Sequence, residues 1–387
     1  MFFIKSHQCE SRFYDRISPK LIQGIKILQI LLYNVTTALK IGGVETFYYS
    51  VAKELMQDHK VTICTGRGKF VPAFLKESNI DLKMFGFRPR DKVLKLGNRF
   101  RKFVERVSFY FNARKFLKSQ KFDVLVIHKP FDFFVAYLLK KYDENLKTIF
   151  VSGGEDFYFF DRFFIKFIDK IISVSDANAD ILRKRYDREI KVVYNGVDKE
   201  KFYPDASLKE KIREKFSVKS NEILIGSVGR VVGWKGFGMM VKNINKIENA
   251  KFMLIGDGEN LQSLRELVTE LNVSQKVIFV GAIGHDELNG YYNACDVYLQ
   301  PSIGHEAFGI TVIEALSANK PCVVSINGGM KEIIKDGVNG YKFKISDESD
   351  MIEKINLTLE NIEKLRPRES IESMYEWSKF AQELVEL

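Results

Sequence analysis

The chain has 387 residues, 45% of them hydrophobic and 28% charged, with a formal net charge of +10. Such a composition excludes an intrinsically disordered, collagen-like or coiled-coil protein, and the length predicts two domains. The cysteines are scattered, which predicts a protein of the reducing cytoplasm without a metal site. We find no signal-peptide pattern, and no apolar run approaches the roughly 18 residues of a membrane-spanning helix, so we expect neither feature.

The first half of the chain alternates short apolar runs with helix-length segments. This alternation is typical of a parallel sheet whose strands are linked by helices. Gly42 and Gly43 form a glycine loop after the first run, ahead of a segment with apolar residues at helical spacing. We therefore predict a Rossmann-like domain over residues 25–204, preceded by an N-terminal extension of residues 1–24. Its predicted strands are residues 26–33, 60–65, 123–128, 148–152, 170–175 and 190–194.

A basic and aromatic segment lies within this half. Residues 83–121 contain 13 basic side chains but only two acidic ones, Asp91 and Glu105. From Phe100 onward, apolar residues recur at helical spacing with basic residues between them, which is typical of an amphipathic helix on anionic lipid. An ordinary helix with its aromatic face in the core is an equal alternative, and no recognised motif supports nucleic-acid binding. The candidate membrane- or acceptor-binding residues are Arg99, Arg101, Lys102 and Arg106.

The alternation stops at residues 195–204, where we expect a hinge, and then restarts. The second series predicts another doubly wound domain over residues 205–365. Ligands of such sheets bind outside the carboxyl ends of the strands, so we expect the functional site in a cleft between the domains. The predicted strands of the second domain are residues 223–228, 252–255, 277–280, 297–299 and 321–324.

Charged residues follow two strands of this second domain. Arg230 and Lys235 lie in a glycine-bearing loop that leads into a helix, where they could grip a diphosphate; the alternative is a basic surface turn. Glu306 follows a later strand, and a helix predicted to begin near Gly309 carries Glu314. The free N–H groups of its first turn would lie between the two carboxylates, although glutamates at this spacing also occur by chance. One site would then offer carboxylates to sugar hydroxyls and a ribose diol, and N–H donors to phosphate.

Four motifs of the second domain occur together: GRxxxxKG at 229–236, GDG at 256–258, E-AFG-xxxx-E at 306–314 and GG-xxEII-xDGxNG at 328–340. This combination resembles the retaining glycosyltransferases of family 4, the group 1 glycosyltransferases, across roughly residues 26–345. The resemblance implies an α/β protein of the GT-B fold, with two doubly wound Rossmann-like domains facing each other across a cleft. It also implies an enzyme that moves a sugar from a UDP- or GDP-sugar, with retention of anomeric configuration and without a metal or other cofactor. A last helix within residues 366–387 would cross back to the first domain.

The resemblance assigns roles to single positions. Arg230 and Lys235 match the pair that holds the donor diphosphate. Glu306 matches the glutamate near the donor sugar, and Glu314 matches the one on the nucleotide ribose. Residues 123–128 resemble the family's DVIHxH strand end, so the expected catalytic residues are Glu306, Arg230, Lys235 and His128. Further donor-binding positions implied by the resemblance are Gly42, Gly43, Gly281, Ala282, Ile283, Phe308, Gly309 and Ile310.

One position departs from the family pattern. The family usually places a histidine after the following strand, where it helps to align the transferred sugar, but Ser152 stands there in this chain. Either that role is lost, or His128, Glu155 or Asp156 covers part of it.

The basic, aromatic character of the first domain is the clue to the acceptor. It indicates a lipid-linked or lipopolysaccharide glycan at an anionic membrane surface, because each Lys or Arg contributes roughly 1 kcal/mol toward an anionic leaflet. We therefore expect a bacterial transferase of lipopolysaccharide, O-antigen or capsule biosynthesis, peripheral on the inner face of the cytoplasmic membrane, with no nucleic acid as partner. The alternatives are a nucleotide-sugar epimerase of the same fold, or a non-catalytic protein that binds membranes or nucleic acid. A dinucleotide-dependent dehydrogenase is disfavoured because neither glycine loop has the pattern GxGxxG.

Overall fold

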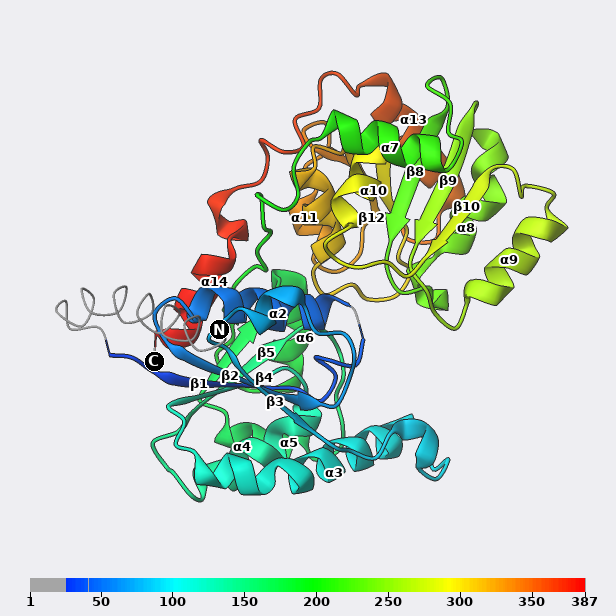
Figure 1. Cartoon of the computed structure of the whole chain (residues 1–387). Helices are drawn as coiled ribbons and strands as arrows, with labels where there is room; N and C mark the ends of the chain where they lie inside the picture. Colours follow the sequence, from blue (N-terminus) through cyan, green and yellow to red (C-terminus); the bar gives the residue numbers. More distant parts are fainter. Residues whose placement is uncertain (1–25, 41, 387) are drawn as a thin grey trace, which may run out of the picture.

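The structure, a computed structural model, describes residues 26–40 and 42–386, so the predicted extension of residues 1–24 lies outside the described residues. The described chain forms two parallel sheets flanked by helices, in two separate lobes (Figure 1). The strand order is β3-β2-β1-β4-β5-β6-β7 in the first sheet and β10-β9-β8-β11-β12-β13 in the second. The predicted pair of doubly wound Rossmann-like domains is therefore confirmed.

The first sheet is built from apolar runs that are buried on both faces, as strands of parallel sheets usually are. Helices α2, α6 and α14 cover the side that faces the other lobe, and α3, α4 and α5 cover the opposite side (Figure 1). Its strands are β1 (Gln29–Tyr33), β2 (Lys60–Gly66), β3 (Asp81–Phe85), β4 (Val124–Ile127), β5 (Lys147–Ser152), β6 (Lys170–Ser173) and β7 (Lys191–Val192). The helices of this half are α2 (Gly43–Leu55), α3 (Asn98–Ser119), α4 (Phe133–Lys140), α5 (Asp161–Phe164) and α6 (Asp176–Arg185), with 3-10 turns η1 (Ala73–Lys76), η2 (Arg90–Lys92), η3 (Pro130–Asp132) and η4 (Ile165–Phe167).

The second sheet repeats this design. Its strands are β8 (Ile223–Val228), β9 (Ala250–Ile255), β10 (Val277–Gly281), β11 (Val297–Gln300), β12 (Cys322–Ser325) and β13 (Gly340–Phe343). The helices are α7 (Ala206–Lys215), α8 (Phe237–Asn243), α9 (Leu261–Glu270), α10 (Leu288–Ala294), α11 (Ile310–Ser317), α12 (Met330–Ile333) and α13 (Glu348–Glu360), with 3-10 turns η5 (Gly233–Lys235) and η6 (Ile244–Lys246). The 3-10 turn η7 (Ser373–Tyr375) and helix α14 (Trp377–Val385) follow, and α14 lies against the first domain (Figure 1). Within the described ranges, we find no helix with the length and apolar character that a bilayer crossing requires.

Two edge strands, β3 and β13, differ from the sequence-based expectation, which left both as connections. In β3 (DLKMF) charged and apolar residues alternate, and each residue is at least partly exposed. β13 is only four residues long and also partly exposed. An edge strand has one neighbour and a more open surface, so it lacks the continuous apolar run that marks a buried strand.

The burial of helix α3 differs from the predicted amphipathic pattern. Phe100, Phe103 and Phe111, expected on its apolar face, are 40%, 37% and 54% exposed. Arg106 Nη1 instead lies 2.5 Å from Asp132 Oδ2 with both side chains buried, so an internal ion pair helps to set the orientation of the helix. Arg106 is therefore inaccessible to a membrane or an acceptor, and the prediction for this residue is wrong. The buried residues of α3 are Glu105, Arg106, Phe109, Tyr110, Ala113 and Leu117.

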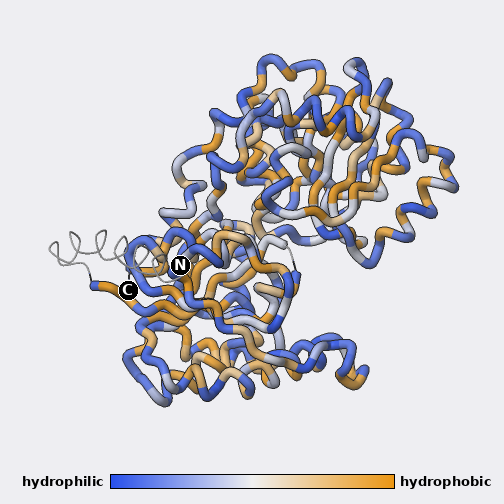
Figure 2. The backbone as a smooth tube through the Cα atoms, viewed as in Figure 1, coloured by the Kyte–Doolittle hydropathy of each residue, from blue (hydrophilic) through white to orange (hydrophobic). Residues whose placement is uncertain are grey.

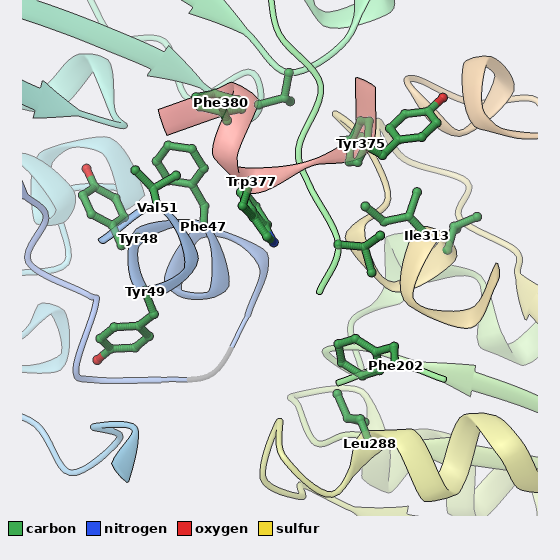
Figure 3. Packing of buried hydrophobic residues seen from close by; sticks show 14 of the residues in the cluster. Phe47, Tyr48, Tyr49, Val51, Phe202, Leu288, Ile313, Tyr375, Trp377 and Phe380 are labelled. Carbon is green, nitrogen blue, oxygen red and sulfur yellow. The ribbon is translucent and has the colours of Figure 1, made fainter. Parts of the chain in front are cut away.

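Helix α14 packs against the first domain after the chain has completed the second. The ring of Phe47 on α2 lies 6.1 Å from the ring of Trp377 and 5.0 Å from that of Phe380 (Figure 3). Phe202, in the segment between the domains, and Ile313 of α11 belong to the same buried cluster. One continuous apolar core therefore joins the two domains beside the expected hinge.

Candidate active site

Two loops of the second domain converge at Lys235 and Glu306. Lys235 Nζ lies 2.5 Å from Glu306 Oε2, and the two side chains are 12% and 18% exposed. Ser302 Oγ lies 3.4 Å from the same carboxylate oxygen. The Lys235 ammonium also lies 4.9 Å from the centroid of the Trp234 ring. An ammonium and a carboxylate are thus held together in a mostly buried position with part of each still open to solvent.

Backbone contacts bring these two loops together. The amides of Ile303 and Gly304 both donate to the carbonyl of Trp234, at 2.8 and 3.0 Å. Gly236 has a φ of +73°, and a Cβ built there would stand 2.0 Å from the carbonyl oxygen of Pro301. A position with positive φ and so little space is suited to glycine alone. The GRxxxxKG motif therefore ends in glycine because its loop must approach the loop after β11.

Arg230 stands two residues after the end of β8 and is exposed. Its charge acts on Lys40 of the first domain, whose pKa is lowered mainly by burial, raised by Glu45, and lowered further by Arg230 and then Lys129. Because the effect of an exposed charge fades within about 10 Å at ordinary salt, Arg230 lies close to the first domain. This places Arg230 on the side of the second domain that is turned toward Lys40.

The start of helix α11 faces the glycine loop of the first domain. The helix begins at Ile310 with Gly309 as its N-cap residue, close to the predicted start. A Cβ added to Gly43 would lie 3.5 Å from Ile310 Cδ1, so the two elements are in contact. Phe308 is 2% exposed and its ring packs on Tyr194, which leaves its backbone rather than its side chain for a ligand. Helix-end amides beside a glycine loop are an arrangement that binds phosphate.

A buried polar chain supports the glycine loop from below. Thr36 Oγ1 donates to Glu45 Oε1 at 2.8 Å, and Asn34 Nδ2 lies 3.1 Å from the hydroxyl of Thr36. Arg106 Nη1 in turn donates to Asn34 Oδ1 at 3.1 Å. Glu45 stands in the first turn of α2, two residues after Gly43. Arg106 therefore helps to fix the loop that contains Gly42, which is a different role from the one that the sequence indicated.

Glu314 lies inside α11 and is 3% exposed. Tyr292 Oη donates to its Oε2 at 2.7 Å, and His285 Nε2 lies 2.7 Å from its Oε1. Glu314 lines a cavity of about 640 Å³ between the domains, together with Gly42 and other residues of the first domain. The sequence analysis did not single out His285, although its place just after the predicted nucleobase loop was a usable signal.

The predicted nucleobase loop follows β10. The carbonyl of Gly281 accepts a hydrogen bond of 2.9 Å from the amide of Gly256, which joins this loop to the GDG motif. Ala282 is exposed, whereas Ile283 is half-buried against the core. The cavity at Glu314 is lined by the next residues, 284–286, rather than by these three. Neither Lys235 nor Glu306 lines this cavity. Glu306 lies four residues before the start of α11, the helix that carries Glu314, so the pair and the cavity are connected only through this short segment of chain.

His128 is packed in the core beneath α2. It is 4% exposed, and its ring centroid lies 5.3 Å from that of Phe47 and 6.0 Å from that of Tyr48. Burial, followed by the charge of Lys129, holds its pKa well below the usual value, so the imidazole is neutral. A Cβ on Gly153 would stand only 2.6 Å from His128 Nε2, so this glycine makes room for the ring. We therefore assign His128 a packing role in place of the predicted catalytic one.

Ser152, which stands in place of the family's histidine, is also internal. Its hydroxyl donates to the carbonyl of Gly154 at 3.3 Å and accepts from Asn178 Nδ2 at 3.2 Å. Glu155 Oε1 lies 3.7 Å from His305 Nδ1 of the second domain, so Glu155 reaches the loop that carries Glu306. Within the part of the chain that the structure describes, no three His, Cys, Asp or Glu side chains form a group that could hold a metal ion.

The remaining residues of the predicted membrane or acceptor set differ in their surroundings. Arg99 is exposed, and the Arg101 guanidinium is bound to Asn98. Lys102 Nζ lies 2.5 Å from Asp156 Oδ1. Lys129 Nζ lies 2.8 Å from the second oxygen of the same aspartate. Two lysines therefore share one carboxylate at the carboxyl ends of β4 and β5.

Comparisons with known proteins agree with this architecture. A family model described as glycosyl transferases group 1 matches residues 209–373, and one described as glycosyltransferase family 4 matches residues 41–201. An uncharacterized glycosyltransferase of Methanocaldococcus jannaschii is 39% identical over 157 residues, 39% of this chain and 40% of the relative. The UDP-Gal:alpha-D-GlcNAc-diphosphoundecaprenol alpha-1,3-galactosyltransferase of Escherichia coli is 29% identical over 194 residues, 48% of this chain and 47% of the relative.

Both matches span less than half the length of these curated relatives. Among solved structures, HepE of Anabaena in complex with UDP and glucose covers 92% of this chain and 95% of its own, with a TM-score of 0.74. Its sequence identity is 19%, so this likeness shows the fold alone.

Proposed function

Because the chain belongs to the group 1 glycosyltransferases of family 4 and has their GT-B fold, we propose that it moves a sugar from a UDP- or GDP-sugar to a lipid-linked or cell-surface glycan. The observation that carries this proposal is the contact between Lys235 and Glu306, on loops that follow two parallel strands. The solved HepE structure contains UDP and glucose, and the name of the Escherichia coli relative gives UDP-Gal as donor. Both support a nucleotide-sugar donor.

The site can stabilise a departing diphosphate. Lys235 and Glu306 neutralise each other at 2.5 Å. A donor diphosphate would be bound by Arg230, Lys235 and the first amides of α11. The Lys235 ammonium would then pair with the diphosphate instead of Glu306, and Glu306 would accept hydrogen bonds from sugar hydroxyls. Donors that are already in place when charge develops stabilise a transition state by about 3–4 kcal/mol each in well-studied cases.

We further propose that the reaction retains the anomeric configuration and needs no metal ion. Arg230, Lys235 and the helix amides supply positive charge at the place where other enzymes use a cation. Glu306 is held by Lys235 and Ser302. Ser302 remains beside this carboxylate when the diphosphate has bound Lys235, and the role that we assign to Glu306 is to orient the sugar rather than to attack it.

The acceptor that we propose carries phosphate. Lys102 and Lys129 share the single carboxylate of Asp156, which leaves this cluster with a net positive charge. The positive charges of this cluster also act on Lys40. Its pKa is lowered mainly by burial, and the charges of Arg230 and Lys129 lower it further. Cations gathered in excess of acids favour a bound anion. The Escherichia coli relative, whose name includes a diphosphoundecaprenol-linked sugar, supports an acceptor of this chemistry.

We propose that the acceptor is met at an anionic membrane, with the protein peripheral on the inner face of a bacterial cytoplasmic membrane and active in lipopolysaccharide, O-antigen or capsule biosynthesis. Lys102 lies over the ring of Phe131, which stacks on Tyr158, so the start of α3 and the segment before α5 are neighbours. Figure 2 shows hydrophobic residues interspersed with hydrophilic ones along this side of the first domain. The membrane-facing surface that we define consists of Leu94, Leu96, Arg99, Phe100, Phe159, Phe163 and Lys166, all exposed.

Thermal stabilisation tests the proposed donor. A ligand that binds the folded state at 100 times its Kd stabilises that state by about 2.7 kcal/mol, and Tm rises accordingly. We expect a rise with at least one UDP- or GDP-sugar in the absence of added metal, and none for Arg230→Ala. Arg265→Ala, an exposed arginine of α9, is the matched control and should respond like the unchanged protein. A panel of nucleotide sugars that leaves the Tm of the unchanged protein where it was would refute the proposal.

A further inference from the structure

A chain of polar contacts runs from α11 to the segment between the two domains. His285 Nε2 lies 2.7 Å from Glu314 Oε1, and His285 Nδ1 lies 2.7 Å from Lys201 Nζ. Lys201 Nζ also lies 2.6 Å from Asp286 Oδ1. These contacts link a carboxylate that is 3% exposed to a lysine in the expected hinge. We call Lys201, His285 and Glu314 the relay.

The chemistry of the three groups allows one arrangement of protons. A lysine ammonium has donors only, so His285 Nδ1 must accept from Lys201. The ring then carries its proton on Nε2, which donates to Glu314 Oε1. Lys201 thereby fixes the tautomer of His285, as the hydrogen bond on one ring nitrogen generally sets the role of the other.

The second oxygen of Glu314 is fixed independently. Tyr292 Oη donates to Oε2 at 2.7 Å, and burial keeps the pKa of Tyr292 well above its usual value, so the phenol stays protonated. The ring of Phe202 packs against both donors, with centroid distances of 5.3 Å to His285 and 5.7 Å to Tyr292. The carboxylate of Glu314 is therefore held in one orientation by a donor on each oxygen.

The relay borders an open space of suitable size. All three of its members line the cavity of about 640 Å³, and Gly42 and Glu45 line it from the first domain. Small-ligand sites typically enclose roughly 300–1,000 Å³. An ionised carboxylate offers about four acceptor positions, and the two donors occupy two of them. The remaining positions are available to hydroxyl groups that enter the cavity.

We propose that His285 and Lys201 are positioning residues that hold Glu314 for the ribose hydroxyls of the donor nucleotide, and so make the site distinguish ribose from deoxyribose. The inference rests on the proposed donor. A site built to bond a hydroxyl loses affinity for an analogue without it, because an acceptor position that faces the ligand is then left unfilled. If the relay sets the orientation of that acceptor, breaking the relay should reduce the preference for ribose while leaving diphosphate binding intact.

Isothermal titration with UDP, GDP, their 2′-deoxy forms and inorganic pyrophosphate tests this proposal. We expect the unchanged protein to bind UDP or GDP at least tenfold more tightly than its deoxy form. Lys201→Met and His285→Ala should lose about tenfold in ribonucleotide affinity, so that the preference nearly disappears, with pyrophosphate affinity unchanged. Lys201→Arg, which can still donate to His285, should keep the preference. Lys199→Ala is the control, since Lys199 lies in the same segment but donates to the carbonyl of Ile371.

The possible outcomes separate this inference from the proposed function. If neither nucleotide nor pyrophosphate binds the unchanged protein, the donor proposal itself fails. If the nucleotides bind but Lys201→Met and His285→Ala keep the full preference for ribose, the relay does not contribute to the discrimination between ribose and deoxyribose. Tighter ribonucleotide binding by His285→Ala would also overturn the inference, because it would mean that the imidazole occupies the place of the ribose. Lys201 is partly exposed, so its methionine variant should fold even if His285→Ala does not.

Discussion

Ser175 Oγ of the first domain donates a hydrogen bond of 2.6 Å to the carbonyl of Ala307 in the second. Ala307 directly follows Glu306, so the loop that carries this carboxylate is anchored across the groove. The same serine caps α6, where its hydroxyl accepts from the amide of Asn178 at 3.1 Å. Glu332 of the second domain adds two contacts to the start of α6. The start of one helix in the first domain therefore holds the Glu306 loop of the second in place.

Ser175→Ala should reduce both kcat/KM and the free energy of unfolding. Loss of the cross-domain hydrogen bond removes about 1 kcal/mol, which corresponds to about fivefold in kcat/KM for the donor. Loss of the helix cap costs about another 1 kcal/mol of unfolding free energy. Asp205→Ala removes the cap of α7 without touching the groove, so it should lower stability alone. Equal kcat/KM in the two variants, measured by release of nucleoside diphosphate, would contradict a role for the Ser175 contact.

Lys235→Met and Glu306→Gln should separate binding from turnover. In the donor complex that we propose, Lys235 gives a charge-assisted hydrogen bond to the diphosphate, so its loss should weaken UDP binding about 10- to 100-fold. Glu306→Gln removes the negative charge that pairs with Lys235, so UDP affinity should hold or increase while transfer falls at least 100-fold. Titration calorimetry and product release provide the two readouts. Weaker UDP binding by Glu306→Gln would mean that the glutamate contributes to nucleotide binding rather than to the sugar.

Arg106→Ala should destabilise the protein strongly. It leaves the buried carboxylate of Asp132 without its cation, and removing one partner of a buried ion pair costs about 3–5 kcal/mol. Arg99→Ala, an exposed position on the same helix, should stay within about 0.5 kcal/mol of the unchanged protein. Urea unfolding measures both. An Arg106→Ala variant that is as stable as the unchanged protein but binds lipid less well would show that Arg106 contacts the membrane after all.

Much of the fold was predictable because buried parallel strands have a direct signature. β8 matches its predicted bounds of residues 223–228, and the Lys235 and Glu306 loops follow strands that the sequence marks clearly. Parallel strands place their carboxyl ends at one edge, so the meeting of these loops follows from local patterns alone. Edge strands carry a weaker signature, which is why β3 was not predicted.

The contacts that were not predictable depend on partners far apart in the chain. Arg106 looks like a surface cation in a basic helix, and only the buried Asp132, 26 residues later, makes it internal. His285 meets Glu314 across 29 residues, and although its place after the predicted nucleobase loop indicates a site, no local pattern indicates this partner. A packed core decides which side chain of a mixed helix turns inward, and periodicity alone does not specify that choice.

Leu94→Ser combined with Leu96→Ser should weaken membrane binding. The two leucines are 74% and 68% exposed, and burial of a leucine in an apolar phase contributes about 1.5–3 kcal/mol. We expect at least a tenfold loss of binding to phosphatidylglycerol-containing vesicles in flotation, and release of the unchanged protein by added salt, which screens the basic residues. Leu271→Ser, an exposed leucine in the second domain, is the control. Equal flotation of the double variant and this control would exclude the defined surface as the membrane contact.

His128 should make the protein less stable as the pH falls below about 6.5. Burial depresses its pKa in the folded state, whereas the unfolded chain takes up a proton near pH 6.5. Its contribution to the free energy of unfolding is therefore fully present above pH 6.5 and is lost below it, by up to about 1.4 kcal/mol per pH unit. Asp132 acts in the opposite direction, because burial raises its pKa to about 6 in spite of Arg106. Its contribution is present at low pH and is lost as the pH rises through about 6.

The two effects partly cancel in the unchanged protein, so a variant is needed to separate them. His128→Asn removes the titrating ring and keeps Asp132. The difference in unfolding free energy between the unchanged protein and His128→Asn should shrink by about 2 kcal/mol between pH 7 and pH 5, because only the unchanged protein loses the His128 contribution. Urea unfolding at each pH gives this difference directly. A difference that stays constant across the range would show that His128 keeps an ordinary pKa and that its ring is accessible to protons in the folded state.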